Sequence, residues 1–125
     1  MVKTYIVSLI IAITLFLGAI LGDLYIRNQF NEFNQTVCVL YRKITDETAT
    51  ADDVYSLQTV WIDKKKTLHA FISHTEIKEM DLWIAECASL VKDNEWTDAV
   101  SKIEVIRELS EQIPKSFSFS VENIL

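Results

Sequence analysis

The sequence predicts an all-α protein in which an N-terminal transmembrane helix continues into an antiparallel four-helix bundle, with a short extended C-terminal tail. Three observations predict this class. The 125 residues include only two Gly and one Pro, which argues against turn-rich folds. An uncharged run lies near the N-terminus, and the apolar residues after it recur at spacings of three and four. We therefore divide the chain into a transmembrane anchor (1–22), a bundle (23–113) and a tail (114–125).

The uncharged run extends from Thr4 to Gly22. As a helix it is about 28 Å long, close to the ~30 Å hydrocarbon core of a bilayer. Lys3 and Arg27 flank it, where their charges reach the head groups. Tyr5 and Tyr25 are spaced to fit the two aromatic belts of a membrane protein. The run therefore predicts a single membrane span.

The alternative is a cleaved signal peptide. The run is longer than the usual apolar region of such a peptide, and it lacks an A-x-A cleavage pattern. The basic residues on the two sides are nearly balanced, so orientation depends on the short basic N-terminus and on Asp23 directly after the run. We expect an uncleaved signal anchor in the cell membrane, with the N-terminus inside and the soluble part extracytoplasmic.

The only two glycines, Gly18 and Gly22, form a G-x-x-x-G pair inside the run. This spacing lets two helix backbones approach closely enough to dimerise within a membrane. Small residues are also common in membrane spans that do not associate. We therefore treat Gly18 and Gly22 as candidate interaction residues.

Apolar spacing predicts the four helices of the bundle. The first continues the span without a Gly or Pro and ends near Thr45. The second starts near Ala51 after a Thr50–Asp53 capping pair, and Ser73 with Glu76 opens the third. The fourth follows a break at 92–94, with Asp93 or Asn94 as its N-cap. The predicted buried positions are Ile26, Phe30, Phe33, Val37, Leu40, Ile44; Val54, Leu57, Trp61, Leu68, Phe71; Ile77, Met80, Ile84, Cys87, Val91; and Trp96, Ala99, Ile103, Ile106 and Ile113, widened by Val100 and Leu109.

Helices of matched length joined by short loops bury these stripes best as an antiparallel bundle. A three-helix packing with one detached helix would leave an apolar stripe in water. Pro114 is expected to end the fourth helix, because proline lacks a backbone N–H and clashes with the preceding turn. In the extended tail, Phe117 and Phe119 would then face one side, to cap the base of the bundle, rest on lipid or bind a partner.

Few residues are candidates for a metal site, a titratable group with a role, or a disulfide. His69 and His74 are five apart, which does not suit a metal pair on one helix, so we expect no metal. His74 with Glu76 is instead a candidate structural cap or pH-responsive element. Cys38 and Cys87 are predicted on diagonal helices, an arrangement that disfavours a disulfide.

Composition narrows the function further. The net charge of −6 and the pI near 4.8 argue against a nucleic-acid partner. The sequence has no glycine-rich phosphate loop and no nucleophile elbow, so we expect no cofactor and no enzymatic activity.

Several short motifs carry a resemblance to a known family. They are Trp61 in a helical region, the stretch His74-Thr75-Glu76-Ile77, and the C-terminal V-E-N-I-L after a terminal span. This layout resembles a family of short single-pass membrane proteins from anaerobic, spore-forming Gram-positive bacteria that is filed as a domain of unknown function. The resemblance implies a membrane-attached bacterial protein and transfers no catalytic residues.

Two functional hypotheses follow. The first is a membrane-anchored structural or protein-interaction module whose partners are the lipid bilayer and either a second copy of the chain or another membrane protein. The alternative is an extracytoplasmic sensory or small-ligand-binding module that works with a partner membrane protein, since helical bundles can bind ligands between their helices.

Overall fold

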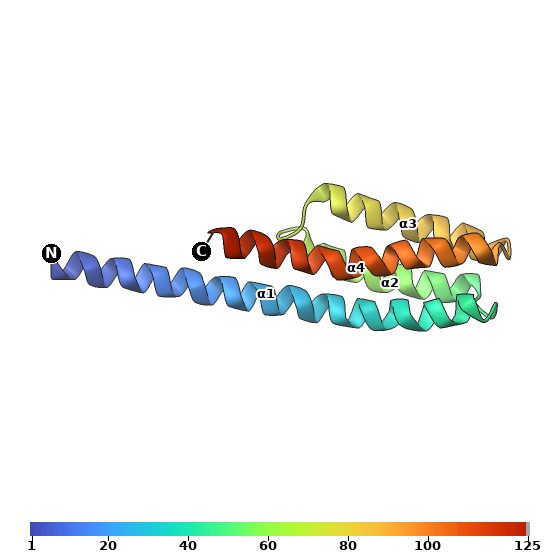
Figure 1. The fold of residues 1–125 in the computed structure, drawn as a ribbon, viewed down its shortest axis with the longest axis horizontal. Coiled ribbons are helices and arrows are strands. Elements are labelled where there is room, and N and C mark those ends of the chain that lie inside the picture. Colours follow the sequence, from blue (N-terminus) through green and yellow to red (C-terminus); the bar gives the residue numbers. More distant parts are fainter. Residues whose placement is uncertain (125) are drawn as a thin grey trace.

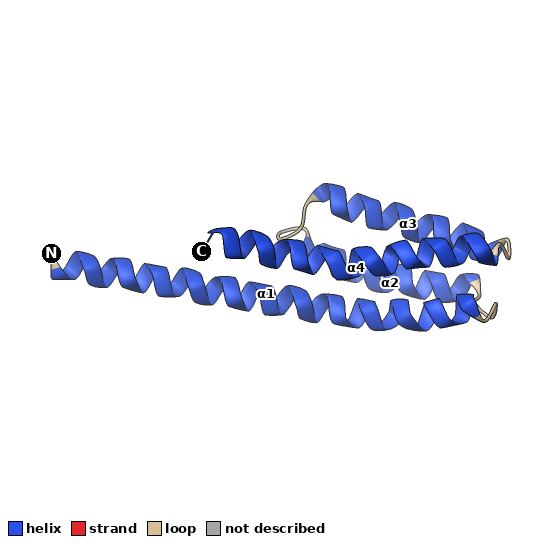
Figure 2. Ribbon diagram, viewed as in Figure 1, coloured by secondary structure: helices blue, strands red, loops and turns tan. Residues whose placement is uncertain are grey.

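A computed structural model describes residues 1–124, with side chains through Lys115. Four helices make up the fold, and the described residues contain no strand. They are α1 (Val2–Thr45), α2 (Ala51–Leu68), α3 (His74–Lys92) and α4 (Trp96–Ile124) (Figures 1 and 2). The predicted all-α bundle with a long N-terminal helix is confirmed.

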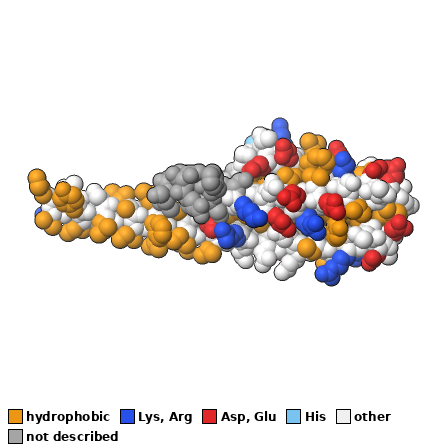
Figure 3. Space-filling view, viewed as in Figure 1, with side chains coloured by type: hydrophobic (Ala, Val, Ile, Leu, Met, Phe, Trp, Pro, Cys, Tyr) orange, Lys and Arg blue, Asp and Glu red, His pale blue; other side chains and the backbone are white. Residues whose placement is uncertain are grey.

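The first helix has two environments along one unbroken length. α1 contains 44 residues, which corresponds to about 66 Å at 1.5 Å per residue. Its N-terminal part projects from the bundle, and apolar side chains cover that projection (Figures 1 and 3). The most apolar part of α1 is entirely unburied, and the helix is long and apolar enough to cross a membrane. Six apolar residues of its second half are buried in the bundle.

The core is built from the predicted stripes. In α1 and α3 the buried residues are the predicted ones. In α4 the predicted residues Ala99, Ile103, Ile106 and Ile113 are buried, whereas Trp96, the first of the predicted stripe, is only half-buried. The largest fully buried side chain is Trp61 of α2, whose ring centroid lies 5.4 Å from that of Phe33 and 6.3 Å from that of Phe30. The apolar residues of the core are Ile26, Phe30, Phe33, Val37, Leu40, Ile44, Ala49, Val54, Leu57, Trp61, Leu68, Ile72, Ile77, Met80, Ile84, Cys87, Val91, Ala99, Ile103, Ile106 and Ile113.

Each helix packs on its neighbours in the chain, and α1 also packs on α4, which closes the bundle. This cyclic order of packing places α1 and α3 on opposite sides of the bundle. Cys38 is exposed on α1, Cys87 is buried on α3, and both are free thiols.

The prediction for Phe71 was wrong. Its side chain is 45% exposed, and Ile72, at 7%, is buried instead. The helical spacing does not extend this far, because α2 ends at Leu68 and the connection to α3 begins there. The Phe71 ring lies 6.0 Å from that of Tyr25 on α1.

Two helix ends use left-handed residues although the chain has no glycine there. Glu47 after α1 and Asn94 after α3 have φ angles of 58° and 57°. The following amides, of Thr48 and Glu95, donate to carbonyls five residues back, at 2.8 and 2.9 Å, as in a Schellman motif. Asn94 therefore ends α3. The expectation that Asp93 or Asn94 caps the start of α4 was wrong, because Asp93 is the C-cap of α3 and α4 begins at Trp96.

The helix starts agree better with prediction. Thr50 and Asp53 form a complete capping box, in which the Asp53 carboxylate accepts from the Thr50 amide at 2.8 Å. The Lys43 ammonium donates to the same carboxylate at 2.8 Å. These bonds, chiefly that from Lys43, lower the pKa of Asp53 below its ordinary value of 3.8. Ser73 caps α3 by accepting from the Glu76 backbone amide at 3.3 Å.

The expected end of the fourth helix at Pro114 was also wrong. α4 contains Pro114 and continues to Ile124, so residues 114–124 are helical and not an extended tail. Proline removes one backbone hydrogen bond, the one to the carbonyl four residues earlier, at a cost of about 3 kcal/mol or more. Pro114 is buried, and α4 packs closely on α1, which offsets this cost.

The last turns of α4 extend beyond the α2–α3 connection and run beside α1 toward its N-terminus (Figure 1). Ser110 and the α1 residue Asn34 are in contact. Continuing this antiparallel register by fourteen residues brings Ile124 level with Ile20. The end of α4 therefore reaches the last turn of the uncharged run.

Candidate functional site

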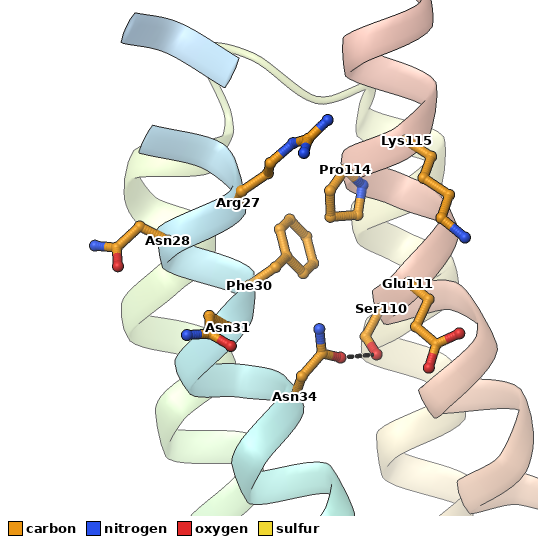
Figure 4. Close-up of a pocket in the computed structure, with 9 residues that line it drawn as sticks. All are labelled: Arg27, Asn28, Phe30, Asn31, Asn34, Ser110, Glu111, Pro114 and Lys115. Atoms are coloured by element: carbon orange, nitrogen blue, oxygen red, sulfur yellow. Dashed lines mark hydrogen bonds between the residues drawn. The ribbon is translucent and has the colours of Figure 1, made fainter. Parts of the chain in front are cut away.

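An open groove of about 620 Å³ lies between α1 and α4 near the end of the bundle from which the projecting part of α1 emerges. Phe30 points from α1 into the space between the helices, toward Pro114 on α4 (Figure 4). The volume is in the range of small-molecule sites. The lining residues are Arg27, Asn28, Phe30, Asn31 and Asn34 of α1, and Ser110, Glu111, Pro114 and Lys115 of α4.

The two sides of the groove are joined by a polar contact between Asn34 and Ser110. The Ser110 hydroxyl is hydrogen-bonded to the Asn34 side chain (Figure 4) and also to the Arg107 carbonyl, at 2.7 Å. Ser110 is completely buried, and it is the one polar residue among the buried side chains of the described part. A buried hydroxyl must be hydrogen-bonded to avoid a desolvation penalty. The pair therefore fixes the register of α4 against α1 at this level.

Charged groups lie at the edge of the groove. The Arg27 guanidinium pairs with Asp23, one turn earlier on α1, at 3.1 Å. Glu111 and Lys115 extend from α4 (Figure 4). Cations, a carboxylate and amides surround an apolar floor, an arrangement suited to a small ligand with both polar and apolar parts.

The predicted interaction residues of the span have different environments. Gly18 is exposed, and a Cβ atom added there would meet nothing within 4 Å. Gly22 is half-buried. The side chains of Phe117 and Phe119 lie outside those that the structure describes, although the backbone at both positions is helical.

The predicted pair at the start of α3, His74 and Glu76, does not act as one unit. His74 is the first residue of α3, and its ring lies 6.1 Å from that of His69, in a stacked arrangement. Glu76 takes part in the cap through its backbone amide, which donates to Ser73. Among residues 1–115 no group of three or more His, Cys, Asp and Glu is placed to hold a metal ion.

The thiols differ in chemical environment. Burial raises the pKa of Cys87 to about 11. Because the thiolate is the nucleophile, a thiol with such a pKa reacts slowly at neutral pH. Cys87 thus serves as a small apolar residue of the core, as predicted.

Sequence reasoning missed the groove, although one signal was present. Ser110 lies in the α4 stripe at the position between Ile106 and Ile113, where the 4-3 spacing calls for an apolar residue. A small polar residue at a core position, four residues before Pro114, marks a local departure from close apolar packing.

The fold defines an all-helical protein in which one helix, apolar and unburied over its first half, continues as the first helix of a four-helix bundle. The sequence model of a family described as "Domain of unknown function (DUF4363)" matches residues 21–124. The chain belongs to this family. No curated protein and no solved structure matches the chain.

Proposed function

We propose that the protein is a non-enzymatic, membrane-anchored helical module with a structural or protein-interaction role. The observation that carries this proposal is the unburied apolar half of α1, which continues without a break into the bundle. A contiguous apolar surface of this size is unfavourable in water and requires lipid or another protein to cover it. Crossing a bilayer once would cover it and leave the bundle at the membrane surface.

The partner that we propose is a second copy of the chain or another membrane protein, bound through the face of α1 that carries Gly18. An open glycine on a membrane helix permits close approach of a second backbone. Gly22 is less suited to a test because it is half-buried. The full-length protein in a mild detergent should form a defined oligomer, or a stoichiometric complex with one membrane protein, in sedimentation and cross-linking experiments.

Substitution Gly18→Ile should disrupt that assembly, since a branched side chain separates the backbones. Ala12→Ile is the matched control, because it makes a similar small-to-large change on another side of the helix. A monomeric wild-type protein without a partner, or equal effects of the two substitutions, would contradict the proposed interface.

We further propose that the bundle is extracytoplasmic, as the signal-anchor pattern indicates. The exposed residue Asp52, near the start of α2, offers a site for an introduced cysteine in a variant with Cys38 and Cys87 replaced. A membrane-impermeant maleimide should label this cysteine in intact cells. Labelling only after lysis would place the bundle in the cytoplasm.

The groove favours a second candidate function, the binding of a small ligand in a sensory module. Its support is the combination of volume and mixed lining described above. A ligand from a small-molecule library should raise the melting temperature of the full-length protein in detergent. The shift should be reduced in Asn31→Ala, which removes an exposed amide from the lining, and kept in Leu82→Ala, at an exposed position of α3. A library without any such ligand would count against this function.

A further inference from the structure

We infer that the α2–α3 connection, residues 69–73, is a lipid-contacting surface, with Phe71 seated in the head-group layer of the bilayer that holds α1. This inference rests on the proposed membrane span. It adds that the bundle lies directly on the membrane surface in a defined orientation, with this connection against lipid.

The level of the connection along α1 follows from a ring contact. Tyr25 lies three residues beyond Gly22, the last residue of the uncharged run, which is about 4.5 Å along the helix. The head-group layer extends about 5 to 7 Å beyond the hydrocarbon core on each side. Tyr25 therefore lies within this layer, where tyrosine side chains concentrate. The Phe71 ring centroid lies 6.0 Å from that of Tyr25, so the two rings differ in level by at most 6.0 Å.

The exposure of the two rings fits a lipid contact. Phe71 is 45% exposed and Tyr25 is 37% exposed, although each is followed in the sequence by a buried core residue, Ile72 and Ile26. Two aromatic rings in contact, open to the outside and level with the membrane boundary, form a surface that is apolar in part. The head-group layer accommodates such rings better than bulk water does.

The polar groups around the rings are compatible with this location. His69, the first residue of the connection, and His74, which directly follows it, are both exposed, and Lys66 is exposed in the last turn of α2. Lys65 pairs with Asp81 at 3.2 Å, which holds the end of α2 against α3. Imidazole and ammonium groups can hydrogen-bond to lipid phosphates, so none of these side chains prevents contact with the head groups.

The test uses the full-length protein in phosphatidylcholine vesicles, with Cys38→Ser and Cys87→Ala as background. An environment-sensitive fluorophore is attached to one introduced cysteine: Ala70→Cys in the connection, Asp52→Cys at the far end of the bundle, or Leu15→Cys in the span. Ala70 is exposed and leaves Phe71 intact. Lipids carrying a nitroxide near the head group, or deep in the acyl chain, quench the fluorophore by contact.

The head-group nitroxide should quench the label at position 70 several-fold more than the label at position 52. Adding Phe71→Ser should reduce the quenching at position 70, and Phe71→Leu should retain most of it. The inference is overturned if the labels at 70 and 52 are quenched equally while the deep nitroxide quenches the label at position 15. It is also overturned if the label at 70 is shielded from aqueous iodide but not quenched by lipid, because a protein would then cover the connection.

A label at position 15 that the deep nitroxide does not quench has a different meaning. The span would not be inserted, and the proposed membrane anchor itself would fail. If Phe71→Ser leaves the quenching at position 70 unchanged, the role assigned to the Phe71 ring is wrong.

Discussion

Truncating Trp61 tests whether α1, α2 and α3 share one interior. The side chain is 1% exposed, contacts the rings of Phe30 and Phe33 on α1, and donates from Nε1 to the Asp81 carboxylate of α3 at 2.7 Å. Trp61 thus joins three helices. Replacing a fully buried aromatic residue by alanine costs about 3–5 kcal/mol through lost burial and the cavity that remains.

The substitution Trp61→Phe is an intermediate change between the wild type and Trp61→Ala. It retains much of the ring contact with α1 but removes the hydrogen bond to Asp81. The Asp81 side chain is 38% exposed and also pairs with Lys65, so water can replace the lost donor. The hydrogen bond is therefore worth about 0.5–1.5 kcal/mol. Together with the smaller ring, we expect Trp61→Phe to cost roughly half as much as Trp61→Ala.

Urea denaturation of the full-length protein in a mild detergent, followed by far-UV circular dichroism, measures these differences. The matched control is Leu82→Ala on α3, where a side chain that is 64% exposed is truncated. Surface changes of this kind stay within about 0.5 kcal/mol. A free energy of unfolding for Trp61→Ala equal to that of Leu82→Ala would refute the assignment of a common core.

Three further predictions concern single groups. In alkylation followed by mass spectrometry, Cys38 should react quickly, whereas Cys87, with a pKa of about 11, should react only after unfolding; equal rates would contradict the burial of Cys87. Because the pKa of Asp53 is lowered in the folded state, its contribution to stability is complete above the ordinary value of 3.8 and is lost as the pH falls below it. Thermal melts should show that, below this pH, the melting temperature of the wild type falls and that the melting temperature of Asp53→Asn falls less. Equal falls in the two proteins would show that the Lys43–Asp53 pair does not stabilise the fold. Glu47→Gly should raise the free energy of unfolding by about 0.5–1 kcal/mol in urea titrations, because glycine avoids a left-handed penalty of about 1–2 kcal/mol and loses part of that gain through its greater freedom in the unfolded chain; a loss of stability would contradict this.

Helical periodicity made most of the core predictable. A helix that packs on one side must repeat its apolar residues every three or four positions, and this requirement is visible in the sequence itself. The six buried residues of α1 and the five of α3 are the predicted ones. Caps such as Thr50 and Ser73 were predictable for a similar reason, because the side chain that forms the bond lies within one turn of its partner.

Features that depend on distant segments were not predictable in this way. Proline within a helix has a local cost of a few kcal/mol, and at Pro114 the packing of α4 against α1 outweighs that cost. Phe71 continues the apolar spacing of α2, but the helix ends three residues earlier, and Ile72 is buried in place of Phe71. The groove likewise depends on Asn34 and Ser110, which are 76 residues apart.

The continuity of α1 has a mechanical consequence for the proposed anchor. Both glycines lie within the uncharged run, and the only proline is in α4, so α1 contains neither residue from Asp23 to Thr45. Sharp helix kinks arise mainly at proline, at Gly/Ser pairs, at π-bulges or at inserted groups, and α1 runs as one unbroken helix through Gly18 and Gly22. The span and the bundle should therefore tilt together, and a change in the tilt of the span would move the α2–α3 connection relative to the lipid surface. A partner that bound the face carrying Gly18 and altered this tilt would change the proposed contact of Phe71 with the membrane, and with it the orientation of the whole bundle.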